Sequence, residues 1–504
     1  MTRSKGTYVA VDLGATSGRV MVGELRDGRI AVTEAHRFPN EPVGFGRQRH
    51  WDVDELFAQT LTGLRKAAAL LPADASTSVG VTAWGVDVGV LGADGSLLAP
   101  VQHYRAADPE GGRALLQRFG GEQLFRRTGV LPQRINTLFR LHDAVGAASA
   151  SAGTGTLDGA TALLVPDLWC ALLTGERATE RSIASTTGLL SVTTGDWDAE
   201  LVRAIEVDDA LLAGVVDNAT VAGPLRGDGV VDIGAANPWR FVRVASHDTA
   251  SAVAAISGRP RTAFLSSGTW SLVGVETTAP VTSTDALDAG FTNEAGLAGT
   301  TLSMRNLTGL WLVEEAIRAW RGQGLDVTIP ALLDEARAVG PIIAAVDVGV
   351  PDLVSAGDVL GTVAGLCTGA GMAPPVTPGE VTRCLLQSLA LSYRRTVELC
   401  QALTGEPVEM VHMTGGGARN ALLRQLTADA CDRPVLFGPV EGTALGSLAT
   451  QAFALGHVTD LAEMQEVLGR STDVGIQAPS GTDSARRFWR RLDDLVPTTS
   501  WSGP

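Results

Sequence analysis

A tight turn near the N-terminus brings together residue types that bind phosphate and metal. The segment from Asp12 to Arg19 reads Asp-Leu-Gly-Ala-Thr-Ser-Gly-Arg, so a carboxylate ends a predicted strand and two hydroxyls and a guanidinium follow it. Backbone N–H groups in such a turn can cradle phosphate oxygens, and Asp12 can hold Mg²⁺ through water. The turn residues whose backbone could do this are Gly14, Ala15, Thr16 and Ser17. An ordinary hairpin turn is the alternative, because Gly, Ser and Thr favour turns in general.

A second turn of small residues follows another predicted strand in the second half of the chain. It reads Ser266-Ser267-Gly268-Thr269 and lies between the strand-like segments RTAFL and WSLVGVE. Either turn alone is compatible with a plain loop. Their matching positions in two half-chains favour a polyphosphate held between two domains.

Two further segments offer groups for nucleotide binding and catalysis. The glycine run 415–417 connects the strand VEMVHM to a helix, and it lets a flat ring or a phosphate approach the backbone and the helix N-terminus. The cluster Ser246-His247-Asp248-Thr249 ends another strand, so Asp248 is placed to accept the proton of an attacking hydroxyl. A turn without a ligand and a helix-capping aspartate are the structural alternatives.

Several familiar kinds of site are excluded by residues that the sequence lacks. Only two lysines occur, Lys5 and Lys66, and neither lies in a P-loop motif or in the context of a protein-kinase strand lysine. No GxSxG motif is present, which excludes a serine-hydrolase elbow. The five cysteines are at least 16 positions apart, so reduced core thiols are expected in place of zinc or dithiol chemistry.

The composition predicts a globular protein with a small-molecule substrate. The chain has 504 residues, of which 45% are hydrophobic, and its formal charge is -15. So acidic a surface repels phosphate backbones and anionic lipid, which argues against nucleic acid or a membrane as partner. The N-terminus shows no signal-peptide pattern and no apolar run approaches the roughly 20 residues of a membrane span, so we expect a cytoplasmic protein.

The elements that must position these groups form a pattern that occurs twice. Three antiparallel strands over residues 8–38, a helix over 51–71 and a buried strand over 78–91 form the first half. The strand, polar turn and strand at 261–276 begin the pattern again, and a long helix, a strand and the glycine run follow. Alternating strands and helices of this kind predict an α/β class with mixed sheets.

Seven segments in order along the chain resemble the FGGY carbohydrate kinases. They are VDLGATSGR, WDVDELF, AWGVD, ASHDTASAV, LSSGTWSLVG, RNLTGLWLVEE and TGGGARNALLRQLTADA, which together span residues 8 to about 437. The resemblance implies a two-domain fold of the actin, Hsp70 and sugar-kinase type, which is ribonuclease H-like, with ATP and Mg²⁺ between the domains. It also implies a ketose substrate phosphorylated on its 1-hydroxyl, with L-rhamnulose ahead of fuculose, ribulose and xylulose.

The resemblance also implies a role for individual residues. Asp248 would be the proton acceptor, and Asp12 would serve the metal. The sugar site would be lined by Gly85, His247, Asp248, Thr249 and Asn306. The nucleotide and its phosphates would be met by Gly14, Ala15, Thr16, Ser17, Arg19, Gly268, Thr269, Glu314 and Gly416. Departures from the family pattern at Thr82, Ala106 and Ala295 leave the exact ketose open.

The expected domains are an N-terminal kinase domain over 1–246, a C-terminal nucleotide-binding domain over 247–460 and a helical tail over 461–504. A monomer or a homodimer is expected. A regulatory ATPase without a sugar substrate is the rival from another functional class. A chaperone would need a large domain after the glycine run, but only about 85 residues follow it.

Overall fold

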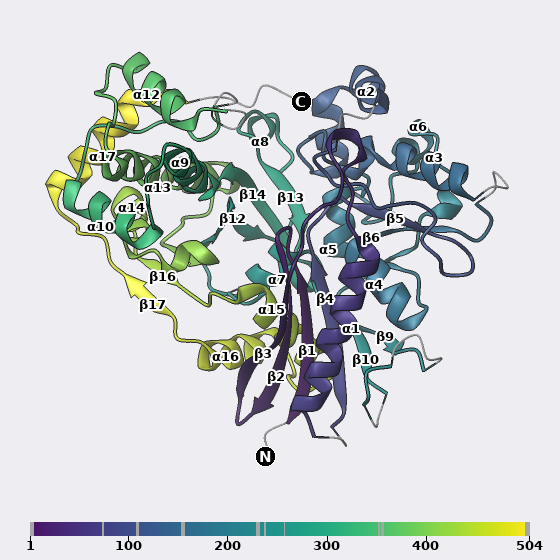
Figure 1. Ribbon diagram of the computed structural model, residues 1–504. Coiled ribbons are helices and arrows are strands. Elements are labelled where there is room, and N and C mark those ends of the chain that lie inside the picture. The colour runs from purple at the N-terminus through teal and green to yellow at the C-terminus, as the bar shows by residue number, and fades with distance from the viewer. Residues whose placement is uncertain are drawn as a thin grey trace.

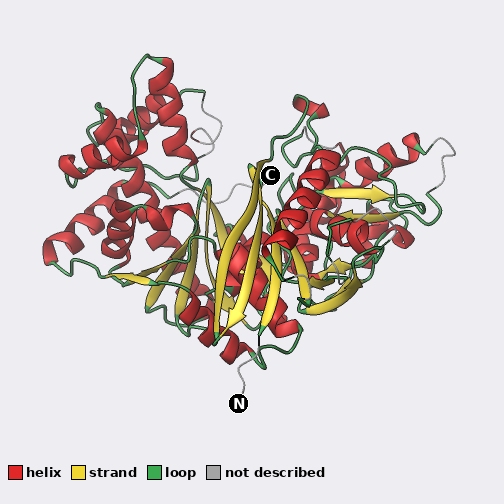
Figure 2. Ribbon diagram, turned by 60° about the horizontal axis from the view of Figure 1, so that its bottom comes forward, coloured by secondary structure: helices red, strands yellow, loops and turns green. Residues whose placement is uncertain are grey.

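Two mixed β-sheets lie side by side in the middle of the protein, with helices outside and between them (Figures 1 and 2). The computed structural model describes residues 5–72, 75–106, 110–152, 157–227, 232–235, 238–256, 258–350, 353 and 357–498. The two sheets define a first lobe and a second lobe. The predicted α/β class with mixed sheets is confirmed.

The first sheet has six strands in the order β3-β2-β1-β4-β10-β9. Their bounds are β1 Gly6–Leu13, β2 Ser17–Arg26, β3 Arg29–Pro39, β4 Thr77–Ala83, β9 Thr220–Pro224 and β10 Arg240–Arg243. The β2–β3 hairpin turns at Asp27 and Gly28, both of which have positive φ, as the Asp-Gly pair predicts. β1 pairs antiparallel with β2 and parallel with β4.

The second sheet has seven strands in the order β13-β14-β12-β11-β15-β16-β17. Their bounds are β11 Thr262–Ser267, β12 Trp270–Thr277, β13 Thr292–Ala295, β14 Thr301–Thr308, β15 Met410–Thr414, β16 Val435–Phe437 and β17 Gly475–Gln477. β11 pairs antiparallel with β12 and parallel with β15. The relation of β1 to β2 and β4 is therefore repeated by β11, β12 and β15, which confirms the predicted duplication of pattern.

Helices cover both sheets and the segment inserted between β5 and β9. Those of the first half are α1 Val53–Leu70, α2 Glu110–Thr128, α3 Leu141–Ser151, α4 Val165–Thr174, α5 Arg181–Ala184, α6 Ala199–Ala204 and α7 Asp248–Ala254. Those of the second half are α8 Thr284–Asp288, α9 Trp311–Gly322, α10 Ile329–Val339, α12 Val359–Gly369, α13 Pro378–Thr404, α14 Ala421–Cys431, α15 Gly442–Ala454, α16 Leu461–Ser471 and α17 Asp483–Leu495. Two short strand pairs, β5 Val88–Leu91 with β6 Thr161–Leu164 and β7 Thr179–Glu180 with β8 Val215–Val216, complete the fold.

Local sequence signals explain where the longest helices begin. The Asp52 side chain accepts a hydrogen bond from the Glu55 N–H and caps α1, which then buries Leu56 and Leu64 against the first sheet. The 27-residue α13 begins with a capping box between Thr377 and Glu380.

Helices α7 and α15 lie between the sheets and join the lobes (Figure 1). Leu445, Leu448 and Ala449 of α15 pack with Tyr8 of the first sheet and Phe264 of the second in one buried cluster. The packed pair of helices therefore fixes the positions of the residues at their first turns, including Asp248 of α7.

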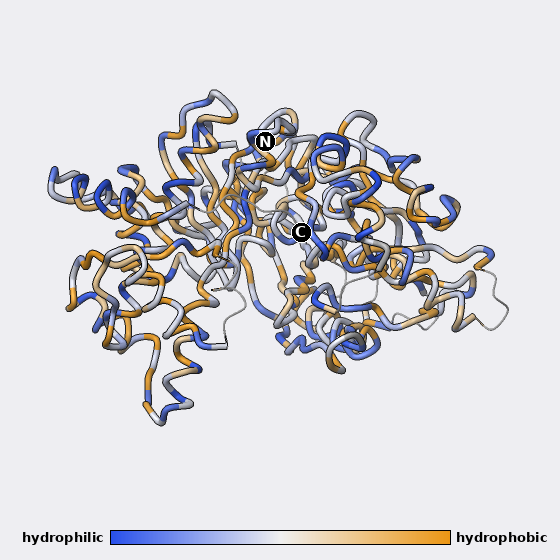
Figure 3. Tube along the Cα trace, turned by 90° about the horizontal axis from the view of Figure 1, so that it is seen from above, coloured by the Kyte–Doolittle hydropathy of each residue, from blue (hydrophilic) through white to orange (hydrophobic). Residues whose placement is uncertain are grey.

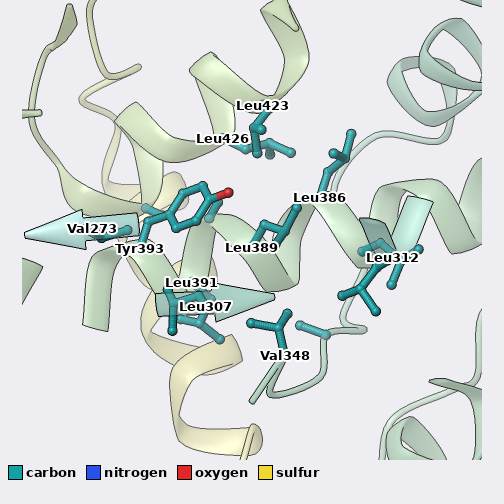
Figure 4. Close-up of a cluster of buried hydrophobic side chains, with 14 of the residues drawn as sticks. Val273, Leu307, Leu312, Val348, Leu386, Leu389, Leu391, Tyr393, Leu423 and Leu426 are labelled. Atoms are coloured by element: carbon teal, nitrogen blue, oxygen red, sulfur yellow. The ribbon is translucent and has the colours of Figure 1, made fainter. Parts of the chain in front are cut away.

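The largest apolar core belongs to the second lobe. Val273 and Leu307 of the sheet pack with Leu389 of α13 and Leu426 of α14 (Figure 4). Apolar stretches run through the centre of the chain trace, and hydrophilic stretches lie toward its periphery (Figure 3). The polar turns that follow β1 and β11 lie outside this apolar core.

Two local predictions are wrong. The segment 78–91 is no continuous strand, because β4 ends at Ala83 and β5 begins at Val88. The small-residue stretch 147–160 was expected to be a surface loop, but residues 147–151 belong to α3; residues 153–156 lie outside the described part of the chain.

The boundaries of the expected domains stay a prediction. Within the expected tail, α16 and α17 are helices and β17 is a strand. β17 pairs with β16, and the Ser471 hydroxyl accepts a hydrogen bond from the Ile30 N–H, so the tail contacts both lobes.

Candidate active site

Asp248 begins α7 directly after the strand segment that continues β10. The segment is held to the end of β4 by a hydrogen bond of 2.9 Å from the Ala83 N–H to the Ser246 carbonyl oxygen. One carboxylate oxygen of Asp248 accepts hydrogen bonds from the Thr249 N–H at 2.6 Å and the Thr249 hydroxyl at 3.2 Å. Its side chain keeps 34% of its surface exposed, so a substrate can reach it.

His247 is held between two carboxylates. Its Nδ1 lies 2.8 Å from Glu294 Oε2, and its Nε2 lies 3.3 Å from Asp248 Oδ1. Burial by itself lowers the pKa of His247, but Glu294, Asp248 and Glu180 together raise that pKa to about 9. The imidazole is therefore a cation at neutral pH.

The carboxyl of Asp12 affects that of Asp248. Burial raises the pKa of Asp248, His247 lowers it, and the negative charge of Asp12 raises it. Burial also raises the pKa of Asp12, against the opposing effect of Arg19. A carboxyl whose pKa is raised is a better proton acceptor when it is ionised, as a general base requires.

The first turn is anchored at both ends. Gly14 donates its N–H to the Ser17 carbonyl oxygen at 3.0 Å, and the Asn40 side chain donates to the Gly14 carbonyl oxygen at 2.7 Å. Thr16 at the tip is exposed, whereas Ala15 and Ser17 are half-buried. The turn after β1 is therefore held in place, with Thr16 exposed at its tip.

Arg19 links this turn to the second lobe. In the register of the hairpin Arg19 lies opposite Asp12, and the two side chains form an ion pair at 2.5 Å. Arg19 also pairs with Glu441 at the start of α15, and Glu441 lies 3.8 Å from Arg419, which follows the glycine run. A chain of charges thus connects the first turn with the glycine run.

The second turn contacts the glycine run directly. A Cβ placed on Gly415, which has φ of 77°, would lie 2.7 Å from the Ser267 carbonyl oxygen. A Cβ on Gly417 would overlap the Ser267 hydroxyl, but one on Gly416 meets no atom within 4 Å. Glycine is therefore needed for packing at 415 and 417, whereas Gly416 borders open space.

Gly268 and Thr269 form the tip of the second turn. The Gly268 N–H donates to the Trp270 carbonyl oxygen at 2.9 Å, and the carbonyl oxygens of Gly268 and Thr269 accept from Leu310 and Gly309 at 2.8 and 3.1 Å. Thr269 is exposed. The loop before α9, at Gly309 and Leu310, therefore holds this turn in place by hydrogen bonds.

Asn306 and Glu314 lie farther along the same lobe. Asn306 is exposed on β14, on the same face as Leu302 and Met304, which pack in the cluster between the lobes. Glu314 is exposed in the first turn of α9. Both positions are open to a ligand, but no contact joins them to Asp248.

A second charged cluster surrounds Asp87. This residue lies three positions after Trp84, which directly follows the end of β4. The Asp87 carboxylate accepts from Trp51 Nε1 at 2.6 Å and from Trp84 Nε1 at 2.9 Å, and it pairs with Arg140 at 2.6 Å. Burial raises the pKa of Asp87, and Arg140 opposes that effect. The chain bends here, so the predicted strand 78–91 is interrupted.

Gly85 lies within this bend. A Cβ on Gly85 would approach the Thr186 hydroxyl to 2.9 Å, and the Val86 N–H donates to the same hydroxyl at 3.1 Å. Gly85 is therefore required for the packing of the bend against the segment after α5.

A row of aromatic rings extends from the bend toward Asp248. The ring centroids of Trp51 and His103 lie 4.5 Å apart, and those of His103 and Tyr104 are stacked at 4.3 Å. Burial lowers the pKa of His103 to about 4, so this imidazole is neutral. Burial and the negative charges of Asp87 and Asp248 raise the pKa of Tyr104, which places its hydroxyl within the field of both carboxylates.

Arg105 closes the row across the two lobes. Its guanidinium carbon lies 5.5 Å from the Tyr104 ring centroid and 5.6 Å from that of Trp270, which directly follows the second turn. Both distances suit a cation–π contact. The first lobe thus touches the second beside Asp248 and Thr269.

The donor set suits a metal that is completed by a ligand. Within the described ranges no group of three or more histidine, cysteine, aspartate or glutamate side chains could hold a metal ion by itself. Mg²⁺ is commonly bound through one or two carboxylates together with substrate phosphates. Asp12, which is 4% exposed and whose negative charge raises the pKa of Asp248, fits that pattern.

Several side chains of the site carry no signal in the sequence. Asp87, Arg140, Glu180, Glu294 and Glu441 are single charged residues in otherwise ordinary segments. Each of them has at least one partner that lies 47 to 422 positions away along the chain, so only the folded structure joins them.

The sequence matches one family over most of its length. Residues 7–255 match the FGGY family of carbohydrate kinases, N-terminal domain, and residues 263–455 match its C-terminal domain. The chain belongs to the FGGY family. A carbohydrate kinase acts on a sugar with ATP, so both ligands follow from family membership. None of the helices in the described part of the chain has the length and apolar character to cross a membrane.

Curated relatives of the FGGY chain match it over nearly its full length. A protein from Bacteroides thetaiotaomicron is 36% identical over 93% of this chain and 94% of its own, and one from Enterococcus faecalis is 34% identical over 95% and 96%. Both are named rhamnulokinase.

Solved structures support the fold. Plasmodium falciparum glycerol kinase with ADP aligns with a TM-score of 0.79 at 14% identity, covering 98% of this chain and 99% of its own. A ligand-bound xylulose kinase from Lactobacillus acidophilus aligns with a TM-score of 0.76 at 16% identity, covering 97% and 96%. The predicted two-domain sugar-kinase fold is confirmed.

Proposed function

We propose that this FGGY kinase transfers the γ-phosphoryl group of ATP to the 1-hydroxyl of L-rhamnulose. The placement of Asp248 carries the proposal, because its carboxylate at the start of α7 keeps 34% of its surface exposed, lies 3.3 Å from His247 and has a pKa that the charge of Asp12 raises. The full-length relatives named rhamnulokinase support L-rhamnulose as the ketose.

The sugar is proposed to lie along the bend and the aromatic row. Gly85, His247, Asp248 and Thr249 would line its reacting end, and Asn306 would approach from β14. The half-buried ring of Tyr104 suits a deoxygenated sugar, which offers a methyl group as well as hydroxyls. The Tyr104 hydroxyl and the His247 cation provide polar contacts.

The nucleotide is proposed to lie between the two turns and the glycine run. The first turn, from Gly14 to Ser17 with Arg19, would meet the phosphates from one lobe, and Gly268 and Thr269 would meet them from the other. Gly416 borders open space where the adenosine would approach, and Glu314 on α9 would lie on the nucleotide side. Asp12 would hold Mg²⁺, which supplies charge neutralisation for the transferring phosphoryl group.

Asp248 would act as the general base. In a loose phosphoryl-transfer transition state the attacking hydroxyl gives up its proton late, so the base mainly orients the hydroxyl and then accepts the proton. The His247 cation holds the Asp248 carboxylate in place at 3.3 Å and keeps its ionised form accessible. Exclusion of water by the lobes would prevent transfer to water.

The test is a coupled ADP-release assay with L-rhamnulose, L-fuculose, L-ribulose and D-xylulose at equal concentrations. We expect kcat/KM for L-rhamnulose to exceed that for each other ketose by at least about tenfold, a difference of roughly 1.4 kcal/mol in transition-state binding. NMR of the product should show phosphate on carbon 1.

Other outcomes would identify a different function. A higher kcat/KM for another ketose would replace the substrate and keep the reaction class. In that case Thr82 and Ala106, which depart from the family pattern, are the residues to examine as the source of the different sugar preference. ADP release that is equally fast without any sugar would favour the regulatory ATPase.

A further inference from the structure

Glu180 is a buried carboxylate that lies directly behind the catalytic segment. It ends β7, is 1% exposed, and accepts six hydrogen bonds. Two of the six come from Ser246, from its N–H at 3.0 Å and from its hydroxyl at 2.5 Å. Ser246 is two residues before Asp248, so this carboxylate fixes the backbone that leads into the base.

A second contact reaches the next residue of the segment. The Ser182 hydroxyl donates to Glu180 and accepts a hydrogen bond from the His247 N–H at 3.1 Å. Ser182 also donates its N–H to Glu180 at 2.8 Å. Consecutive N–H groups of the catalytic segment, those of Ser246 and His247, are therefore held by Glu180 directly and through Ser182.

The same carboxylate is tied to the opposite lobe. The Asn218 side chain donates to Glu180 at 3.1 Å and to the Gly296 carbonyl oxygen at 2.9 Å, and it accepts from the Ala298 N–H at 3.0 Å. Gly296 is two residues after Glu294, the partner of His247. Glu180 thus anchors the segment that carries the base and, through Asn218, the loop that directly follows β13, the strand on which Glu294 lies.

We propose that Glu180 is a positioning residue for phosphoryl transfer, which sets the place of Asp248 and of the His247–Glu294 pair. The proposal rests on Asp248 as the base. Burying a carboxylate costs free energy unless every contact compensates it, and here all six contacts are donated to it. Misplacement of a base by about 1 Å can reduce a rate by roughly 10²-fold, so this anchor affects turnover more than ligand binding.

The electrostatics of the site give an independent sign of the same role. The negative charge of Glu180 is one of the charges that raise the pKa of His247, together with Glu294 and Asp248, while burial acts against them. Asp248 of α7 and Glu294 of β13 contact the imidazole directly, whereas Glu180 of β7 contacts the backbone beside it through Ser246 and Ser182. Removal of the Glu180 charge should therefore lower the pKa of His247 from its value of about 9.

The experiment compares Glu180→Gln, Glu180→Asp and Ser246→Ala with a matched control, Asp198→Asn. Asp198 is also a buried carboxylate, 7% exposed, which caps α6 and pairs with Arg127 away from Asp248. For each variant the ketose KM, the ATP KM, kcat, the melting temperature and the NMR titration of the His247 imidazole would be measured.

We expect Glu180→Gln to lower kcat by about 10- to 10²-fold while both KM values change less than about threefold. Glu180→Asp, which keeps the charge, should keep the His247 titration near that of the unmodified protein and recover part of kcat. Ser246→Ala should show a smaller fall in kcat. Asp198→Asn should lose melting temperature to a similar degree while keeping kcat.

Two results would overturn the proposal. One is an unshifted His247 titration with more than half of kcat retained in Glu180→Gln; the other is an equal fall of kcat in Asp198→Asn, which would show general destabilisation. The outcome stays distinct from a failure of the proposed function. If Asp248→Asn remains active, the base is wrong, yet the His247 titration still reports whether Glu180 acts on the segment.

Discussion

The two hairpin turns occupy equivalent places in their sheets but are built from different chemistry. The first turn is flanked by Asp12 and Arg19, and Arg19 joins Glu441 of the other lobe. The second turn, Ser266 to Thr269, contains no charged residue and packs on the glycine run. The two turns therefore share the same strand arrangement but differ in chemistry. The first turn is flanked by charged side chains, and the second lies close to the backbone of the glycine run.

This difference between the turns predicts that substitutions near the first turn and near the second turn will have different kinetic effects. Changes beside the first turn and α7 should affect the chemical step, because they alter charges near the reacting atoms. Changes around the second turn should affect nucleotide binding, because they alter the shape of a backbone surface. Five predictions, from the largest expected effect to the smallest, test the comparison.

The largest effect is expected from Asp248→Asn. The amide still accepts from Thr249 but cannot take a proton, so kcat should fall by roughly 10²- to 10⁴-fold with the ATP KM nearly unchanged. Steady-state kinetics with the best ketose measure both constants. More than a tenth of the original kcat in this variant would remove Asp248 as the base.

Asp12→Asn should lower kcat by about 10²-fold and raise the Mg²⁺ concentration needed for half-maximal rate, because several kcal/mol of charge stabilisation depend on the metal. It should also move the acid limb of the rate profile. Burial raises the pKa of Asp248, and the charge of Asp12 raises it further. Loss of that charge lowers this pKa, so activity should persist to lower pH. An acid limb that moves to higher pH would contradict the assigned interaction.

The sequence predicted the frame well because the frame follows local rules. The alternating apolar strands over 8–38 and the helical pattern over 51–71 predicted the first half of the fold, and the second hairpin predicted the duplication. The candidate residues of both turns, of α7 and of the glycine run lie at the sheet ends where strand order predicts them.

The rest of the site could not be predicted, because it depends on contacts between distant segments. Nothing local marks Arg140 as the partner of Asp87, or Glu180 as the acceptor for Ser246, 66 positions away. The bend at Trp84 to Asp87 was missed for a related reason. Its apolar residues continue the pattern of a buried strand, but Asp87 is drawn inward by two indole N–H groups and Arg140.

Gly416→Val is expected to raise the ATP KM by about tenfold while the ketose KM changes little. A Cβ at this position meets no atom within 4 Å, so the protein should keep its melting temperature and the side chain should occupy space needed by the nucleotide. Gly417→Ala is the matched control, because its methyl group overlaps the Ser267 hydroxyl and should lower the melting temperature. Equal damage to both KM values in Gly416→Val would indicate misfolding.

The smallest effect concerns closure of the lobes. If phosphates are held by turns from both lobes, ketose and nucleotide must favour the same closed form, and each should tighten the binding of the other by roughly 1 to 3 kcal/mol. Calorimetric titration of a non-hydrolysable ATP analogue with and without ketose measures this coupling, and equal affinities in the two titrations would exclude it.

The contact of Arg105 with Trp270 identifies one source of that coupling. Arg105 belongs to the first lobe beside Tyr104, and Trp270 directly follows the second turn, so their contact joins the two lobes. A cation–π contact at an exposed site contributes about 0.5 to 1 kcal/mol. Trp270→Ala should therefore reduce the coupling by about two- to fivefold without abolishing it, and Arg105→Ala should do the same. In the double variant the loss should equal that of either single variant, because both remove one contact. Additive losses would show that the two side chains act separately, and closure would then depend on the charge chain through Arg19 and Glu441 instead.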